Sequence, residues 1–279
     1  SDLVWTQLGV KIGLWVAYAL LMALTGFIAA WLAIRARPDS VDGSTIRING
    51  DVVEVGKSAS SKTARRVAVV ISLIVGVIFG SQFNANWSEI LLMFNAQKFG
   101  TTDPQFGLDN GFYVFVLPGL KLVLAAVAML LGVGLVFSLV THVLMGGIRI
   151  TMPVNGRGLF SITKRARRQL GIWLILNMLA WSARQVLGVF DQLTVQGSRI
   201  TGASYTAVHA NIPVTFIMAA LTAILGVVLG VWLMQSHALE GQASIGVRAS
   251  AAFKAWRVPV IAIAATVVVG MVLTIAWPI

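Results

Sequence analysis

The chain has 279 residues, of which 57% are hydrophobic and only 11% are charged, whereas a soluble globular domain carries about 25% charged residues. Its formal net charge is +11, but the lysines and arginines lie between apolar runs instead of lining one face with interleaved aromatic residues. They therefore favour anionic membrane lipids over nucleic acid as the partner. No cysteine is present, which excludes disulfides and cysteine-ligated metal sites within these residues.

Six apolar runs are long enough to cross a membrane, because a helix of roughly 20 residues spans about 30 Å of hydrocarbon. They are expected at 8–34, 67–86, 120–146, 169–190, 212–235 and 257–277. The fourth run is the weakest because it contains Arg184. Unpaired strand edges are not tolerated in lipid, so residues 1–279 are predicted to form one all-α transmembrane domain with six spanning helices.

The loops between these runs alternate in charge. Fifteen lysines and arginines fall in segments 35–66, 147–168 and 236–256, whereas segments 87–119 and 191–211 carry one each, Lys98 and Arg199. By the positive-inside rule the first group is cytoplasmic. Both ends of the chain are then expected outside the cytoplasm of a bacterial plasma membrane. A chain that begins outside, at Ser1, implies a seventh helix before it, and we expect this to be a segment of a longer protein.

The first cytoplasmic loop, 35–66, contains a hairpin pattern. Alternating residues from Thr45 to Val55 flank Asn49 and Gly50, a pair that favours the positive φ angles of a tight hairpin turn. The sequence therefore predicts a small cytoplasmic β-hairpin.

The outside loop 87–119 is predicted to be ordered. Asn86 is expected to cap a short helix in which Glu89 is the third residue. The apolar residues of that helix share one face, which predicts an amphipathic helix lying in the outer membrane interface. Turns are expected around Asp103 and Asp109. Residues 112–116 are expected to be extended up to Pro118.

Two outside motifs carry a family resemblance. The first comprises Trp87–Asn95, Phe99-Gly100, Asp103-Pro104, Phe106-Gly107, Asp109, Phe112-Tyr113, Phe115 and Leu117-Pro118; the second comprises Gly202–Thr206, Val208–Ala210 and Pro213. Together they resemble a large, functionally uncharacterised bacterial membrane-protein family best known from actinobacteria, although Ala207 stands where the family has Asp. The resemblance implies seven N-terminal membrane helices followed by a large extracytoplasmic domain. It implies no reaction.

The outside loops also hold the best candidates for chemistry, Asp103, Asp109, Tyr205 and His209. Tyr205 and His209 share a helix face at i and i+4, and the four residues together would suit acid/base chemistry or ligand binding. The alternative is that they form hydrogen-bonded turns. His142 and His237 are expected at the cytoplasmic side, so we expect no multi-histidine metal site. No nucleotide or cofactor motif is present.

Two further sets of polar residues stand out. Asn177, Arg184 and Asp191 are spaced by seven and form a stripe that is either a polar pathway or Arg184 reaching outward to Asp191. The second set is a candidate lipid-headgroup cluster made of Lys164, Arg165, Arg167 and Arg168.

Three Gly-x-x-x-Gly pairs, which allow close helix contact within the bundle or between copies, begin at Gly9, Gly76 and Gly226.

These features favour a membrane anchor or scaffold of a cell-envelope protein, with the handling of envelope lipids along the bundle as a further role. Its expected partners are membrane lipids, anionic ones on the cytoplasmic side, and its own extracytoplasmic domain. A homo-oligomer or a larger envelope complex stays open as a further partner. One alternative is a transporter or channel, which would need polar residues facing a cavity at the membrane midplane. The other is a membrane enzyme acting on a lipid-linked substrate, which would need a cleft joining the outside polar residues.

Overall fold

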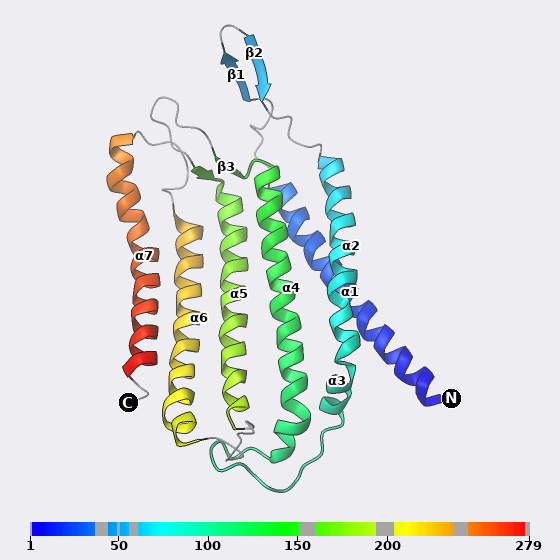
Figure 1. The fold of residues 1–279 in the computed structure, drawn as a ribbon. Helices are drawn as coiled ribbons and strands as arrows, with labels where there is room; N and C mark the ends of the chain where they lie inside the picture. The colour runs from blue at the N-terminus through cyan, green and yellow to red at the C-terminus, as the bar shows by residue number, and fades with distance from the viewer. Residues whose placement is uncertain are drawn as a thin grey trace.

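A computed structural model describes residues 2–36, 44–48, 51–55, 61–150, 160–193, 204–236 and 245–276. Long helices dominate these residues, and short strands and turns connect them (Figure 1). The helices are α1 (Asp2–Arg35), α2 (Ser61–Ala85), α3 (Trp87–Phe94), α4 (Leu117–Leu144), α5 (Lys164–Asp191), α6 (Ile212–Gln235) and α7 (Ile245–Ala276). The strands are β1 (Ser44–Ile48), β2 (Asp51–Val55), β3 (Ile148–Ile150) and β4 (Phe160–Ile162).

The predicted all-α architecture is confirmed. Among the described residues, five helical stretches are long and apolar enough to cross a membrane, namely Gln7–Arg35, Lys62–Ser81, Phe112–Leu144, Lys164–Asp191 and Ala207–Gln235. These correspond to the first five predicted runs. The sixth lies in α7, whose apolar stretch Arg257–Leu273 is shorter.

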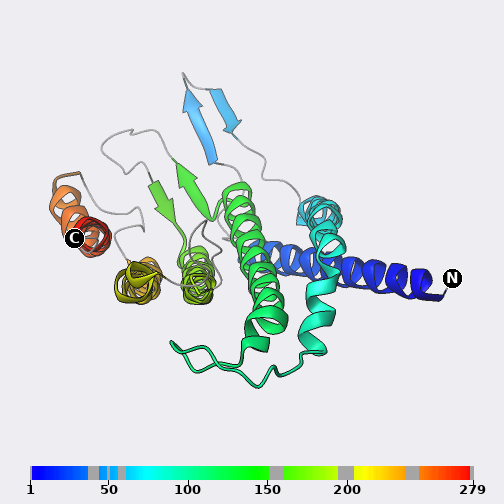
Figure 2. The ribbon, with the colours of Figure 1, turned by 60° about the horizontal axis from the view of Figure 1, so that its bottom comes forward.

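The long helices form a single curved layer. In the order α2, α1, α4, α5, α6, α7 each helix packs against the next (Figure 2). Helix α1 crosses α2 and α4 obliquely, so that its N-terminal half leaves the layer (Figure 1). A single layer leaves two faces of each helix uncovered, and large apolar side chains are exposed along all of them, for example Leu20, Ile78, Val136, Leu176, Ile224 and Ile261. Such continuous apolar surface fits lipid surroundings.

Small residues allow the closest helix contacts. A Cβ atom added at Gly76 of α2 would overlap the carbonyl oxygen of Ala19 in α1, and one added at Gly230 of α6 would overlap Ile175 of α5. Around Gly9 and Gly13 of α1, nothing lies within 4 Å of an added Cβ. Two of the three Gly-x-x-x-Gly pairs therefore build helix contacts within the chain, and the third faces no described residue.

Polar side chains inside the helices tie neighbouring helices together. Each of them donates a hydrogen bond to an oxygen of another helix. The pairs are Tyr18 to Ala126 O (3.1 Å), Gln169 to Ala29 O (2.9 Å), Asn177 to Leu131 O (3.0 Å), Ser182 to Ala219 O (2.7 Å) and Gln185 to Thr222 Oγ1 (3.0 Å). Apolar burial gives little driving force between helices in lipid, so such bonds help to hold a membrane bundle together.

Two short hairpins lie at one end of the layer. Strands β1 and β2 are antiparallel, and Ile48 pairs with Asp51. This confirms the predicted hairpin, although its turn residues Asn49 and Gly50 lie outside the described part of the chain. No hairpin was predicted for β3 and β4, whose Ile148 and Ile162 are buried against Leu170.

At the opposite end, α3 begins after Asn86 as predicted, but the Asn86 side chain makes no capping hydrogen bond. The amide of Glu89 bonds instead to the Asn86 carbonyl oxygen (3.2 Å). Ile90 packs on Tyr18 of α1, whereas Phe94 is 77% exposed. The helix thus has one face on the bundle and an apolar face that is free for lipid.

The prediction that residues 112–116 are extended was wrong. Phe112–Val116 form a π-helical turn that runs directly into α4. Gly111 already has helical φ and ψ angles of −60° and −28°. Pro118 is the second residue of α4 and follows this turn directly. A run of aromatic and β-branched residues reads as a strand, but here the chain enters the helix before it reaches them.

Candidate functional site

A network of hydrogen bonds organises the end loop, which we define as residues 95–113, between α3 and α4. Asp103 organises its first half, because both of its carboxylate oxygens accept hydrogen bonds. The donors are the amides of Gln105 (2.8 Å), Phe106 (2.8 Å) and Leu108 (3.0 Å) and the hydroxyl of Tyr113 (2.7 Å). Gly107, with a φ of +67°, supplies the left-handed turn that lets these amides converge.

Asp109 organises the second half in the same way. Its carboxylate accepts hydrogen bonds from the amides of Phe99 (3.0 Å), Gly100 (2.9 Å) and Gly111 (2.7 Å). Gly100 has a φ of +72°. At Gly111 any side chain would overlap the carbonyl oxygen of Gln97. The loop therefore depends on two aspartates and on glycines at defined positions.

Both carboxyl groups are stabilised in the ionised form. Partial burial alone would raise the pKa of Asp103, but the hydrogen bonds from the Phe106 amide and the Tyr113 hydroxyl outweigh it and hold that pKa below its usual value. The pKa of Asp109 is lowered by the amides of Phe99 and Gly111. A carboxylate that accepts several N–H bonds is a weak base, so this environment suits a structural role better than proton transfer.

Aromatic side chains dock the end loop on helix α5. Phe190, near the end of α5, lies 5.1 Å from the ring of Phe106 and 5.6 Å from that of Phe112, measured between centroids. The Tyr113 ring, which also reaches Asp103, lies 6.3 Å from Phe190. Aromatic pairs in this range stabilise a fold beyond their buried area. Phe190 was not among the residues predicted from sequence, although an aromatic residue in the last turn of a predicted span is a usable signal.

Tyr205 and His209 form a separate pair at the start of α6. Their rings stack at 4.0 Å with an interplanar angle of 22°, and His209 Nδ1 lies 3.1 Å from the Tyr205 carbonyl oxygen. Tyr205 is 78% exposed. None of the hydrogen bonds that Asp103 and Asp109 accept in the described structure comes from this pair. The four candidate residues therefore form two groups: the two aspartates that organise the end loop, and the stacked pair of Tyr205 and His209.

The predicted polar stripe on α5 is divided as well. Asn177 bonds to α4, and Asp191 forms an ion pair with Lys121 of α4 at 2.7 Å. Arg184 is exposed and makes no ion pair in the described part of the chain. The suggested pairing of Arg184 with Asp191 was therefore wrong, because the Lys121 ammonium group already lies against that carboxylate.

We expect the substitution Lys121→Met to change stability little. The side chains of Lys121 and Asp191 are 43% and 44% exposed, and exposed ion pairs contribute about 0–1 kcal/mol. The midpoint of thermal unfolding of the detergent-solubilised protein should move by no more than a few degrees. A large loss would mean that this pair contributes more to the contact between α4 and α5 than an exposed ion pair normally does.

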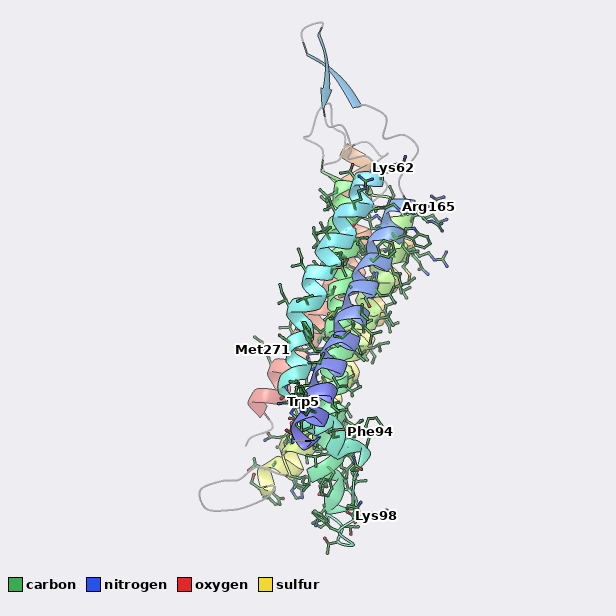
Figure 3. The ribbon with its side chains drawn as sticks, turned by 90° about the vertical axis from the view of Figure 1, so that its right-hand side faces the viewer. Trp5, Lys62, Phe94, Lys98, Arg165 and Met271 are labelled. Atoms are coloured by element: carbon green, nitrogen blue, oxygen red, sulfur yellow. The ribbon has the colours of Figure 1, made fainter. Side chains whose placement is uncertain are left out.

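Most of the described cations lie at the opposite end of the bundle. Figure 3 shows Lys62 and Arg165 at one end and Lys98 at the other. Within the predicted headgroup cluster, Lys164, Arg165 and Arg168 are exposed, but Arg167 is only 1% exposed. Sequence alone could not separate Arg167 from its neighbours, because its burial is a product of tertiary packing.

Two of the three histidines are described, and they lie at opposite ends of the bundle. His142 is buried in α4, where its Nε2 lies 3.0 Å from Gln169 Oε1 of α5. His237 falls outside the described residues. Among the residues that the structure describes, no group of three or more His, Asp or Glu side chains comes together as metal ligands would.

Comparison with known proteins gives a family and no activity. Residues 1–279 match the model of an uncharacterised protein family, UPF0182. The chain is 91% identical over its full length to a UPF0182 protein of Bifidobacterium longum and 73% identical to one of Bifidobacterium adolescentis, covering 26% of each. A UPF0182 protein of Corynebacterium diphtheriae is 34% identical over 78% of the chain, which covers 22% of that protein.

The chain spans about a quarter of the length of the Bifidobacterium relatives that it matches. No solved structure matches it. The expected resemblance to an uncharacterised actinobacterial membrane-protein family is confirmed by the family model and by these relatives. The chain belongs to the uncharacterised protein family UPF0182.

Proposed function

We propose that this chain is the membrane-embedded part of a larger cell-envelope protein, and that it anchors and positions the rest of that protein outside the cytoplasm. The apolar helices support the membrane location. The relatives support a larger whole, because the chain covers only 26% of the Bifidobacterium proteins. In this proposal the membrane part supplies a rigid base, and any chemistry belongs to the remaining polypeptide.

The observation that carries the proposal is the construction of the end loop. Its two aspartates are saturated by amide and hydroxyl donors, and its aromatic residues fix it on α5. Ordering a loop of this length costs conformational entropy, and a simple connector would not need such order. A fixed surface with the exposed side chains of Phe99 and Gln105 suits the docking of a second domain.

The polar residues inside the helices also support an anchor. A channel or transporter would direct polar groups into a cavity at the midplane. Here Asn177, Ser182 and Gln185 bond to the adjacent helices, which makes them part of the packing.

For orientation, we propose that the end with Lys62, Arg165 and the two hairpins faces the cytoplasm and that the end loop faces outside. Arg35, Lys62, Arg65, Arg66, Lys164, Arg165 and Arg168 are exposed at the first of these ends. Lysine and arginine are retained on the cytoplasmic side of membrane proteins, so this asymmetry favours the stated direction.

Cysteine labelling of the full-length protein in intact cells tests this orientation, and the 279 residues contribute no cysteine of their own. With any other cysteine replaced by serine, Thr206→Cys should react with a membrane-impermeant maleimide from outside, because Thr206 is exposed shortly before α6 and is not part of the proposed docking surface. Lys164→Cys should react only after the cells are permeabilised, because the membrane shields it. The reverse pattern would invert the topology and remove the proposed docking side.

Site-specific photo-crosslinking tests the docking role itself. A photoreactive amino acid at Gln105 or Phe99 should crosslink to the part of the same polypeptide that lies outside this chain. The same group at Val140, which is exposed in the second half of α4, should capture lipid. Mass spectrometry identifies both products. If the end-loop positions capture only lipid or water, the end loop is not a docking base and the proposal fails.

A further inference from the structure

The cation-rich end of the bundle has its densest cluster at the start of α5. Lys164, Arg165 and Arg168 are exposed there, and the first turn contains no acidic residue. The N-terminal end of a helix carries positive partial charge, so cations in this turn destabilise the helix. Lys164 and Arg168 also repel each other at i and i+4. The arrangement becomes favourable when an anion lies among these side chains.

The start of α5 is also held firmly. Thr163 accepts a hydrogen bond from the Ala166 amide at 3.3 Å, and its own amide donates to the Gly147 carbonyl oxygen at 2.9 Å. One turn further on, Gln169 bonds to Ala29 O of α1 at 2.9 Å. Arg165 and Arg168 therefore stand on a fixed helical base, and a ligand that binds them does not have to order the backbone first.

An exposed apolar track continues below these cations. Ile172, Leu176 and Leu179 are 45%, 40% and 41% exposed. Steps of three and four residues put them on the same face of α5 as Arg165 and Arg168. About 16 Å of helix separates Arg168 from Leu179, which matches the roughly 15 Å thickness of one hydrocarbon leaflet. Positive charge at the membrane surface suits the headgroup of an anionic phospholipid, and the aliphatic surface next to it suits an acyl chain.

We infer that this face of α5 binds one anionic phospholipid, whose phosphate lies between Arg165 and Arg168 and one of whose acyl chains follows Ile172, Leu176 and Leu179. Guanidinium groups suit the phosphate because they bind it with two parallel hydrogen bonds. The buried Arg167 takes no part. The inference rests on the membrane location in the proposed function and adds a specific ligand to it.

Native mass spectrometry of the full-length protein in detergent tests this site. Phosphatidylglycerol and phosphatidylcholine with identical acyl chains are titrated separately, and the bound lipids per protein are counted. We expect saturable binding of one phosphatidylglycerol at concentrations where phosphatidylcholine does not bind. Arg165→Gln/Arg168→Gln should weaken this binding at least about tenfold.

A matched control removes the same charge elsewhere. Lys62 and Arg66 are exposed at the same end, on α2, and Lys62→Gln/Arg66→Gln should change the affinity less than about twofold because distant charges are screened. Arg165→Lys/Arg168→Lys keeps the charge but loses the two-bond geometry, so it should bind with intermediate affinity. If the glutamine variant is not monodisperse, the lysine variant carries the test.

The proposed site would be overturned if both lipids bound equally, or if the α5 and α2 variants lost lipid affinity equally. Either result would indicate unselective electrostatic attraction. Inorganic phosphate that protects the wild-type protein against heat while no lipid is retained would also overturn it. Cysteine labelling at Thr206 and Lys164 separates the two failures. If the labelling is as expected but no lipid binds selectively, only the proposed lipid site is contradicted. If the labelling pattern is reversed, the proposed orientation is contradicted.

Discussion

Replacing Gly76 by valine is expected to separate helices α1 and α2 and to destabilise the protein strongly. An added Cβ would overlap the carbonyl oxygen of Ala19, and backbone cannot move aside as a flexible side chain can. Overpacking of a close contact costs about 1–3 kcal/mol, and we expect the upper part of this range. The midpoint of thermal unfolding in detergent and the monodisperse fraction both measure the effect.

Gly13→Val is the matched control for this substitution. Gly13 also belongs to a Gly-x-x-x-Gly pair in an apolar helix, but nothing lies within 4 Å of its added Cβ. The variant should therefore unfold like the wild-type protein. Equal losses in the two variants would show that the effect comes from glycine in the helix backbone and not from the α1–α2 contact.

Asp103→Asn is expected to loosen the end loop. The asparagine NH2 group would replace one carboxylate oxygen and face either the amides of Gln105 and Phe106 or the Leu108 amide and the Tyr113 hydroxyl, so at least one amide would lose its acceptor. The unmatched donors cost about 2 kcal/mol. This corresponds to roughly thirtyfold faster hydrogen exchange of the loop amides, which mass spectrometry of residues 99–113 can measure.

Glu89→Gln is the control, because Glu89 is a neighbouring carboxylate in α3 that accepts none of the loop's hydrogen bonds in the described structure. It should leave exchange in residues 99–113 unchanged. Fast exchange in the wild-type loop would contradict the hydrogen-bonded structure of the end loop. Equal exchange in Asp103→Asn and wild type would mean that the aromatic contacts alone keep the loop ordered.

The same bonds predict how the end loop responds to pH. The pKa values of Asp103 and Asp109 are lowered in the folded protein from their usual value of 3.8. As the pH falls, these carboxyl groups are therefore protonated at a higher pH in the unfolded protein than in the folded protein, and their protonation favours unfolding. Their stabilisation is complete above the usual pKa and is lost as the pH falls through the lowered values. The protection factors of residues 99–113, which correct the exchange rates for the intrinsic effect of pH, should fall only below about pH 4, and less steeply in Asp103→Asn.

The sequence was sufficient for features that depend on local pattern and length. The apolar runs predicted the helices, and Asn49-Gly50 predicted the first hairpin. The turns at Asp103 and Asp109 followed from residues that bond to their own backbone. Residues 112–116 were misread because aromatic and β-branched residues favour a strand only when a sheet edge is present, and here they continue α4.

The candidate site was predictable only in part, for a physical reason. Which partner a polar group finds depends on residues far away in sequence: Lys121 lies 70 positions from Asp191, and no local pattern relates them. The docking of Phe190 on the end loop and the burial of Arg167 are likewise products of packing. Tyr205 and His209 were correctly expected to share a helix face, but their separation from the two aspartates was not foreseen.

A single curved layer of helices does not surround a central channel. The surfaces of the described helices that do not pack against a neighbouring helix are open to their surroundings, so the described helices of a single copy enclose no water-filled route through the bilayer. If a relative moves an ion or a lipid across the membrane, the second wall of that passage must come from another copy or from the rest of the polypeptide. Permeation would then require assembly, and a purified single copy of this layer would be expected to leave a sealed vesicle tight.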